Sequence, residues 1–202
     1  ALKNLEAEAS GRTFDELTIQ ASEKWNKELS VIEAHGDKDK LTMLYTSLYH
    51  TLINPSVYAD VDGQYRGVDQ AVHQTKDFMN YTVFSVWDTY RALHPLFNII
   101  NRERNTDMVK SMIAHSQQSV HKALPVWSHM GNENWCMIGY HSVSVLSDAI
   151  AKGLPVDKDQ SLKAMISSSS IPYYDYTDEY MKLGYVPFDQ SASAASITLE
   201  YA

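Results

Sequence analysis

Apolar residues recur at helical spacing along most of this chain, and this period constrains the fold more than any other feature. In each segment they fall at i, i+3, i+4 and i+7, so that one face of a helix becomes apolar. The two stripes nearest the N-terminus consist of Phe14, Leu17, Ala21, Trp25, Leu29 and Ile32, and then of Leu41, Leu44, Tyr45, Leu48 and Leu52. Further stripes lie within residues 87–101, 109–123, 137–152 and 157–170. The pattern predicts a mostly helical chain whose successive helices pack against one another.

Start and stop signals divide these stripes into separate helices. Thr13-Phe-Asp-Glu16 is a capping box, which predicts that the first long helix begins there. The stop signals after later stripes are Asn54-Pro55, Pro125, and Gly153 followed by Pro155. Two more helices are predicted near the C-terminus, at Asp178–Leu183 and at Ser191–Ala202.

A segment near residues 57–68 lacks the helical period. Asp62-Gly63 is typical of a type I′ turn between two short alternating runs, so we predict a β-hairpin insertion here. Asp60 and Asp62 also resemble the start of an EF-hand calcium loop. An EF-hand needs Glu at the twelfth position, where Ala71 stands, so this interpretation fails. Asp60 and Arg66 are retained as candidates for the border of a cavity.

The bulk composition excludes several classes of protein. The chain has 202 residues, of which 44% are hydrophobic, and is long enough for a folded core. Its net charge of −8 and its lack of basic runs argue against binding to nucleic acid or to an anionic membrane surface. No apolar stretch is long enough for membrane insertion. Cys136 is the single cysteine, which excludes an internal disulfide and a zinc ribbon.

The segment Phe84–Pro95 is the strongest candidate for a binding function. Trp87 stands beside Asp88, and an aromatic ring beside an acid suits a sugar: the ring covers the C–H face and the carboxylate accepts from hydroxyl groups. Ser85-x-x-Asp88 is also a capping-box pattern, and the two roles can coexist. Arg91, one turn further, is interpreted either as orienting the Asp88 carboxylate or as a simple helix ion pair.

Two other pairs of polar residues are candidates for the site. Asn132 and Glu133 would be hydrogen-bond partners that line a cavity, or a turn and helix N-cap, since the residue types suit both. His141 and Asp148 are seven residues apart and therefore share one helix face. They would either contact the residues that bind the ligand, without touching the ligand themselves, or form a structural clamp between neighbouring helices.

Helices joined by short and long links suit an irregular bundle or a toroid of helical hairpins. In a toroid, the loops between helices line a cavity at one end, which predicts polar and aromatic motifs at the starts of alternate helices. The chain has this distribution of motifs. They run from Tyr49-His50 through the Asp62 turn to Trp87-Asp88 and then to Gly131–Trp135.

The longer motifs, in their order along the chain, resemble those of a known enzyme family. They are Leu48-Tyr-His-Thr51, Tyr58–Gly67, Phe84–Arg91, Gly131-Asn-Glu133 with Cys136–Ser142, and Thr198-Leu-Glu-Tyr-Ala202. Together they resemble glycoside hydrolase family 92, the calcium-dependent exo-acting α-mannosidases. The spacing between the motifs makes this resemblance more specific than any one motif.

The resemblance implies an N-terminal β-sandwich followed by an (α/α)6 toroid, with the active site between them. Residues 1–202 would be the first part of the toroid, without the sandwich or the remaining helices. Such enzymes remove terminal α-linked mannose, commonly 1,2-linked, with inversion, and they require Ca²⁺. The general acid, the base and most calcium ligands are expected beyond Ala202, so no catalytic or metal-binding residue is assigned here. Asp88, paired with Trp87, matches the family motif and is the first choice for accepting from mannose hydroxyls.

The resemblance also implies that the parent enzyme is periplasmic, displayed on the outer surface or secreted. The isolated chain is expected to be inactive, and its oligomeric state is not predicted. The rival interpretation is a non-catalytic helical module, a glycan-binding or scaffold protein. A toroidal glycosidase of the trehalase or glucoamylase type is less favoured, because the Gly131–Glu133 and Met137–Ser142 motifs do not suit it.

Overall fold

The structure is a computed structural model that describes residues 1–75, 77–137, 139–172 and 177–187. The helices are α1 (Leu2–Ala9), α2 (Phe14–Leu29), α3 (Lys38–Thr51), α4 (Val86–Thr89), α5 (Leu93–Ile100), α6 (Arg102–Gln118), α7 (Ser142–Ala151), α8 (Lys158–Ser169) and α9 (Thr177–Leu183). The strands are β1 (Ser56–Val57), β2 (Gln64–Arg66), β3 (Val72–Gln74), β4 (Tyr81–Thr82), β5 (Phe84–Ser85), β6 (Trp127–His129) and β7 (Asn132–Glu133). The prediction of a mostly helical chain with a small β insertion is therefore confirmed.

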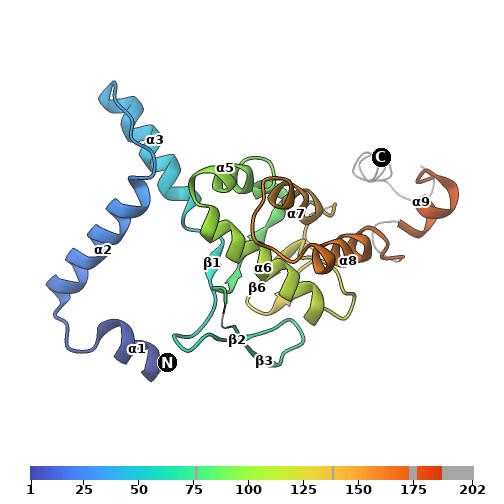
Figure 1. Cartoon of the computed structure of the whole chain (residues 1–202), viewed down its shortest axis with the longest axis horizontal. Helices are drawn as coiled ribbons and strands as arrows, with labels where there is room; N and C mark the ends of the chain where they lie inside the picture. Colours follow the sequence, from blue (N-terminus) through green and yellow to red (C-terminus); the bar gives the residue numbers. More distant parts are fainter. Residues whose placement is uncertain (76, 138, 173–176, 188–202) are drawn as a thin grey trace.

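The body of the molecule is built around α6, which contacts α5, α7 and α8 (Figure 1). Its apolar face lies in the centre of the core, together with residues from the neighbouring helices. The most deeply buried apolar residues of this core are Phe84, Val86, Phe97, Met108, Val109, Met112, Leu146 and Ala149. Burial of this apolar surface is the main force that holds the body together.

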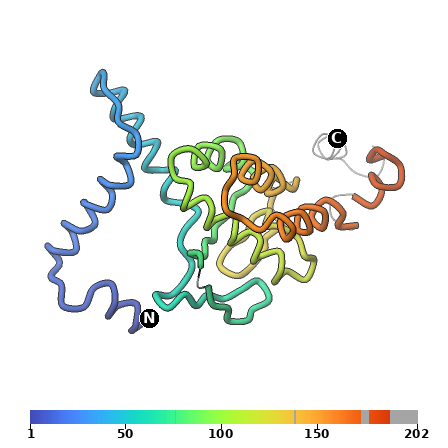
Figure 2. The backbone as a smooth tube through the Cα atoms, viewed as in Figure 1, coloured from blue at the N-terminus to red at the C-terminus, as the bar shows by residue number. Residues whose placement is uncertain are grey.

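The N-terminal helices α1–α3 form an arm that extends away from this body (Figure 2). The predicted capping box at Thr13 and Glu16 is confirmed, and it begins α2. No residue of α2 is buried, however, and Phe14 is 82% exposed. The arm meets the body through Leu29, which packs against the core, and through an ion pair between Glu28 and Arg104 (2.7 Å). The amphipathic stripe therefore predicted the helix correctly, but it did not predict whether another part of the chain packs on its apolar face.

The β structure near residues 57–68 differs from the predicted hairpin in its pairing. Asp62-Gly63 does reverse the chain, since the Gly63 N–H donates to the Asp60 carbonyl (2.8 Å). Gly63 has a positive φ of 82°, but Asp62 does not, so the turn is not the type I′ that we predicted. The paired strands are β2 with β3, and β1 pairs separately with β4.

The helix predicted over Trp87–Asn101 is broken into α4 and α5. The reason is Pro95, whose ring would clash with the carbonyl of Arg91 in a continuous helix. Pro95 is instead the third residue of α5, where a missing N–H costs no helical hydrogen bond. The break at Tyr90–Ala92 places Arg91 between two helices and not one turn along from Asp88.

Two other helix boundaries were predicted wrongly. The helix expected from residue 137 begins only at Ser142, because Met137 and Gly139 have positive φ values of 67° and 89°, which a right-handed helix excludes. The helix expected through residue 123 ends at Gln118, where Ser119 turns to an extended conformation. As a result, Val120 is exposed and does not join the core.

The predictions at the C-terminus are tested only in part. The helices predicted at residues 157–170 and 178–183 are confirmed as α8 and α9. The helix predicted at Ser191–Ala202 and the motif Thr198–Ala202 lie outside the described residues. Within the described ranges, no helix is both long enough and apolar enough to cross a bilayer.

Candidate sugar-binding site

Four side chains gather where α4, the break after it and the start of α7 meet. The Tyr90 and His141 rings are stacked, with centroids 4.1 Å apart and planes 6° from parallel. Trp87 lies beside them, its ring centroid 5.9 Å from that of His141. The Arg91 guanidinium carbon is 5.2 Å from the centroids of both Trp87 and Tyr90. We refer to Trp87, Tyr90, Arg91 and His141 as the aromatic cluster.

Asp88 follows Trp87 of the aromatic cluster in α4, and its side chain is exposed. The Ser85 hydroxyl donates to its carboxylate, but the reciprocal bond of a capping box is not formed. Arg91 stacks on rings and, within the described part of the chain, makes no ion pair with Asp88, so its interpretation as a helix ion pair is wrong. An orienting role for Arg91 stays a prediction. The exposed carboxylate beside aromatic rings suits the binding of sugar hydroxyls.

Trp127 is a further candidate, which the sequence analysis missed. It pairs directly with Ser85 across the antiparallel strands β5 and β6, so both side chains stand on the same face of the sheet. Ser85 in turn donates to Asp88. Trp127 is half-buried, and among the described residues its ring has no aromatic or cation–π partner. Its place opposite Ser85, the donor to Asp88, depends on strand register, which no local motif revealed.

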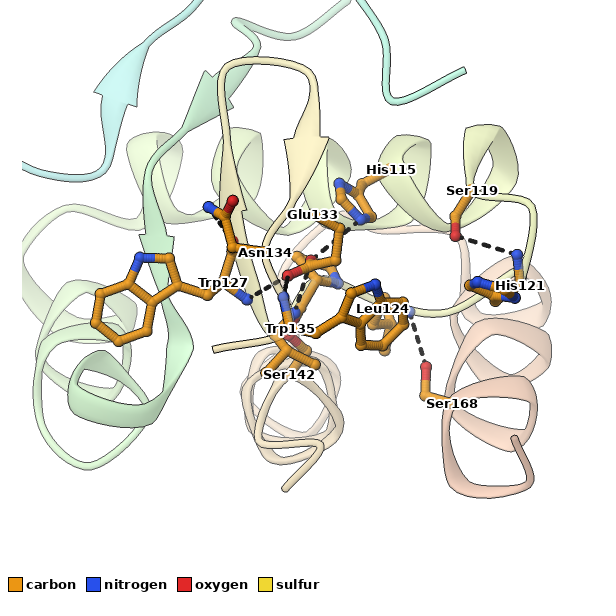
Figure 3. A network of polar contacts seen from close by, with 12 residues as sticks. His115, Ser119, His121, Leu124, Trp127, Glu133, Asn134, Trp135, Ser142 and Ser168 are labelled. Carbon is orange, nitrogen blue, oxygen red and sulfur yellow. Dashed lines mark hydrogen bonds and ion pairs between the residues drawn. The ribbon is translucent and has the colours of Figure 1, made fainter. Parts of the chain in front are cut away.

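Glu133 lies on the other side of this strand, with only 8% of its side chain exposed. One carboxylate oxygen accepts from the N–H groups of Trp127 (2.8 Å) and Trp135 (3.0 Å), and the other accepts from Val126 N–H (3.0 Å) (Figure 3). Its interpretation as a helix N-cap is wrong, because Glu133 belongs to β7 and α7 begins nine residues later at Ser142. A direct bond from Glu133 to a sugar remains a prediction.

His115, on α6, lies beneath the Glu133 carboxylate. Its Nε2 is 3.5 Å from a Glu133 oxygen, and its side chain is 9% exposed. Burial lowers the pKa of His115 to about 4, so the ring is neutral at pH 7. Burial also raises the pKa of Glu133, while the backbone N–H groups of Trp127, Trp135 and Val126 act against that shift.

Asn132 is exposed in β7, at the tip of the same loop. The neighbouring Gly131 is required by close packing: its φ is +78°, and a Cβ there would lie 3.2 Å from the Gly67 carbonyl oxygen. Gln70 also donates to the Gly131 carbonyl (2.7 Å). The loop is thus docked on the β2–β3 turn, and Asn132 as a substrate ligand stays a prediction.

Asp148 acts as a clamp between helices, one of its two predicted roles. It accepts from Asn98 (2.7 Å), which accepts from Asn105 (2.7 Å), whose amide oxygen lies 2.8 Å from His94 Nδ1. Because an amide oxygen only accepts, His94 carries its proton on Nδ1. Burial lowers the pKa of His94 to about 4. The chain of bonds links α5, α6 and α7, while His141 belongs to the aromatic cluster.

Asp60 lies apart from this region, whereas Arg66 packs against Gly131 of the loop. Asp60 and Arg66 line one depression of about 300 Å³ beside β2, and Asp60 accepts from Asn4 of α1 (2.7 Å). Neither is placed by an observed contact next to Asp88. Within the described residues, no group of three or more His, Cys, Asp or Glu side chains could hold a metal ion. Calcium binding by the parent enzyme stays a prediction, and no chemical step is derived through calcium.

Comparisons with known proteins give the family. The model of the glycosyl hydrolase family 92 catalytic domain matches residues 1–202. No curated protein matched the chain. A solved family 92 α-mannosidase from Bacteroides thetaiotaomicron is 46% identical, with a TM-score of 0.96 over 100% of this chain and 27% of that one. The same enzyme has been solved with mannoimidazole.

A family 92 inverting mannosidase from the same bacterium is 34% identical, with a TM-score of 0.89 over 100% of this chain and 28% of that one. The present chain thus spans little more than a quarter of the length of either relative. The likeness in structure confirms the predicted fold class, part of a helical toroid with a small β insertion. Since the family model matches every residue, this chain belongs to glycoside hydrolase family 92.

Proposed function

We propose that this chain forms part of the mannose-binding cavity in an exo-acting α-mannosidase that releases terminal α-linked mannose from glycans. The observation that carries the proposal is the family match over residues 1–202. Relatives described as α-mannosidases support it, one of them in complex with mannoimidazole. As the resemblance implies, we place the general acid and the base outside these residues.

In this proposal Asp88 accepts hydrogen bonds from mannose hydroxyl groups, and the rings beside it cover the apolar face of the sugar. Such contacts away from the reacting carbon help to distort the sugar ring towards the transition state. An inverting enzyme also needs an acid and a base about 6.5–9.5 Å apart. The aromatic cluster borders the exposed Asp88, which supports a binding role for this region.

Three finer features of the proposal rest on the family resemblance. The preferred linkage is α-1,2. The enzyme requires Ca²⁺, with most ligands supplied from outside these residues. The parent protein works in the periplasm, on the outer surface or outside the cell, where mannose-containing glycans are its substrates.

The test is mannose release from α-1,2-mannobiose by the protein expressed from its complete gene, with and without a calcium chelator. We expect release that the chelator abolishes and added Ca²⁺ restores. The isolated 202-residue chain, assayed beside it, should release no mannose. If the folded, calcium-loaded protein releases no mannose from any α-mannoside, the enzyme proposal fails and a non-catalytic glycan-binding module replaces it.

A further inference from the structure

The Glu133 carboxylate is the point to which the backbone of the 126–135 loop is fastened. Three backbone N–H groups donate to it, from Val126, Trp127 and Trp135, at 2.8–3.0 Å. His115 adds a fourth neighbour at 3.5 Å. A carboxylate has about four acceptor positions, and the three N–H donors fill most of them. Glu133 thus has little left to offer a ligand directly.

The loop needs such an anchor because its backbone is strained. Met130 and Trp135 have positive φ values of 46° and 51°, and so does Met137 just after the loop, at 67°. Each such non-glycine residue costs about 1–3 kcal/mol, so the conformation persists only where surrounding contacts enforce it. The tip is held by Thr82, whose hydroxyl oxygen accepts from Met130 N–H (2.8 Å). Glu133 instead holds both sides of the loop at its base.

Glu133 fixes the strand residue that stands next to Asp88. The Trp127 N–H points to the carboxylate, while the indole ring points away from it (Figure 3). The pairing of Trp127 with Ser85 then sets that ring on the face where Ser85 donates to Asp88. Arg91 stacks on Trp87, whereas Trp127 has no such contact among the described residues.

We propose that Glu133 is a positioning residue that acts through Trp127: its carboxylate holds the Trp127 backbone so that the indole forms an aromatic wall beside Asp88. The ligand of this wall is a terminal mannose, whose C–H face packs on the ring while Asp88 accepts from its hydroxyl groups. This inference rests on the proposed function, and it replaces a direct sugar contact of Glu133 with an indirect one.

The test is a double-mutant cycle on the protein expressed from its complete gene, with an aryl α-mannoside as substrate. We expect Glu133→Gln and Trp127→Ala each to raise KM about tenfold, since a lost aromatic contact has about that value. Because Glu133 acts through Trp127, the double variant should be no worse than Trp127→Ala alone. The exposed Glu103→Gln is the matched control and should leave KM unchanged.

The inference would be overturned if the KM increases of the two single variants added up in the double variant. It would also be overturned if Trp127→Ala raised KM as expected while Glu133→Gln left it unchanged. Glu133→Asp serves as a second variant in case Glu133→Gln does not fold. It keeps the negative charge but shortens the side chain by one methylene, so its oxygens lie further from the N–H donors. It should give a smaller loss with the same non-additivity. Near-UV circular dichroism distinguishes a failure of this inference from a failure of the proposed function. If the parent hydrolyses no mannoside, the proposed function fails. If the near-UV signal of Trp127 is lost in both Glu133→Gln and Trp127→Ala, the positioning role of Glu133 is still supported.

Discussion

Two carboxylates, Asp88 and Glu133, lie on either side of one short strand and have opposite environments. Asp88 is exposed, follows Trp87 in the chain and, among the described residues, accepts from Ser85 alone. Glu133 is buried and accepts from three backbone N–H groups. The difference shows that residue type alone does not identify a ligand-binding acid. A carboxylate that is filled by backbone N–H donors, such as Glu133, holds the shape of the site. A carboxylate that is open to solvent, such as Asp88, is able to bind a ligand.

The largest expected effect is a dependence of the unfolding free energy on pH, which arises from the buried region around Glu133 and not from Asp88. The His115 pKa of about 4 lies below the ordinary value of 6.5, so its contribution to stability is present above pH 6.5 and lost as the pH falls towards 4. The loss is about 3 kcal/mol. The raised pKa of Glu133 acts in the opposite sense and reduces it.

Urea unfolding between pH 7 and 4 measures this loss. His115→Gln should flatten the dependence of the unfolding free energy on pH, whereas the exposed His35→Gln should not. The same slope in parent and His115→Gln would show that this histidine is not held neutral beneath Glu133.

The second effect concerns Asp88. Asp88→Asn removes a charged acceptor for sugar hydroxyl groups, and we expect kcat/KM on an α-mannoside to fall about 100-fold. Its unfolding free energy should change by less than about 0.5 kcal/mol, because the side chain is exposed. Steady-state kinetics and urea unfolding of the same preparation test both parts. A large loss of unfolding free energy in Asp88→Asn would mean that Asp88, like Glu133, has a structural role.

The third effect is the reverse case. Glu133→Gln replaces one acceptor oxygen by an amide that faces N–H donors, so we expect a loss of about 2 kcal/mol in unfolding free energy. Hydrogen exchange should accelerate in the peptide that contains residues 126–135 and stay unchanged in α8. Unaltered exchange in that peptide would mean that the carboxylate does not hold the loop.

The smallest effect comes from the backbone before Asp88. Val83 has a φ of +62°, which is strongly disfavoured for a β-branched residue. Val83→Gly should relieve this strain and raise the unfolding free energy by about 1 kcal/mol, after the entropic cost of glycine. Activity should fall a few-fold, because the turn that places β5 loosens. A loss of stability would indicate that the Val83 side chain matters more than its strain.

The sequence predicted helices well where local rules decide them. The capping box at Thr13 and Glu16 forms as expected. Period and capping depend on neighbours within one turn, which the sequence displays directly. The break before Pro95 was missed because the apolar stripe continues through it, although proline alone provides the reason.

The site was predicted less completely, for a physical reason. Asp88 and Trp87 stood out because their types and adjacency are local. The register of Ser85 with Trp127 and the three N–H bonds to Glu133 depend on tertiary pairing and on left-handed residues such as Trp135. A run containing two tryptophans and Gly131-Asn-Glu133 was the available signal, but it did not reveal which side chain faces the cavity.

The most direct test compares the two carboxylates on a panel of substrates. The measurement is kcat/KM of the parent, Asp88→Asn and Glu133→Gln on an aryl α-mannoside and its 2-, 3-, 4- and 6-deoxy derivatives. If Asp88 contacts a hydroxyl group, its penalty should nearly vanish for a derivative that lacks that group, while the Glu133 penalty stays equal across the panel. A Glu133 penalty that vanishes for one derivative, or a uniform Asp88 penalty, would contradict the roles assigned here.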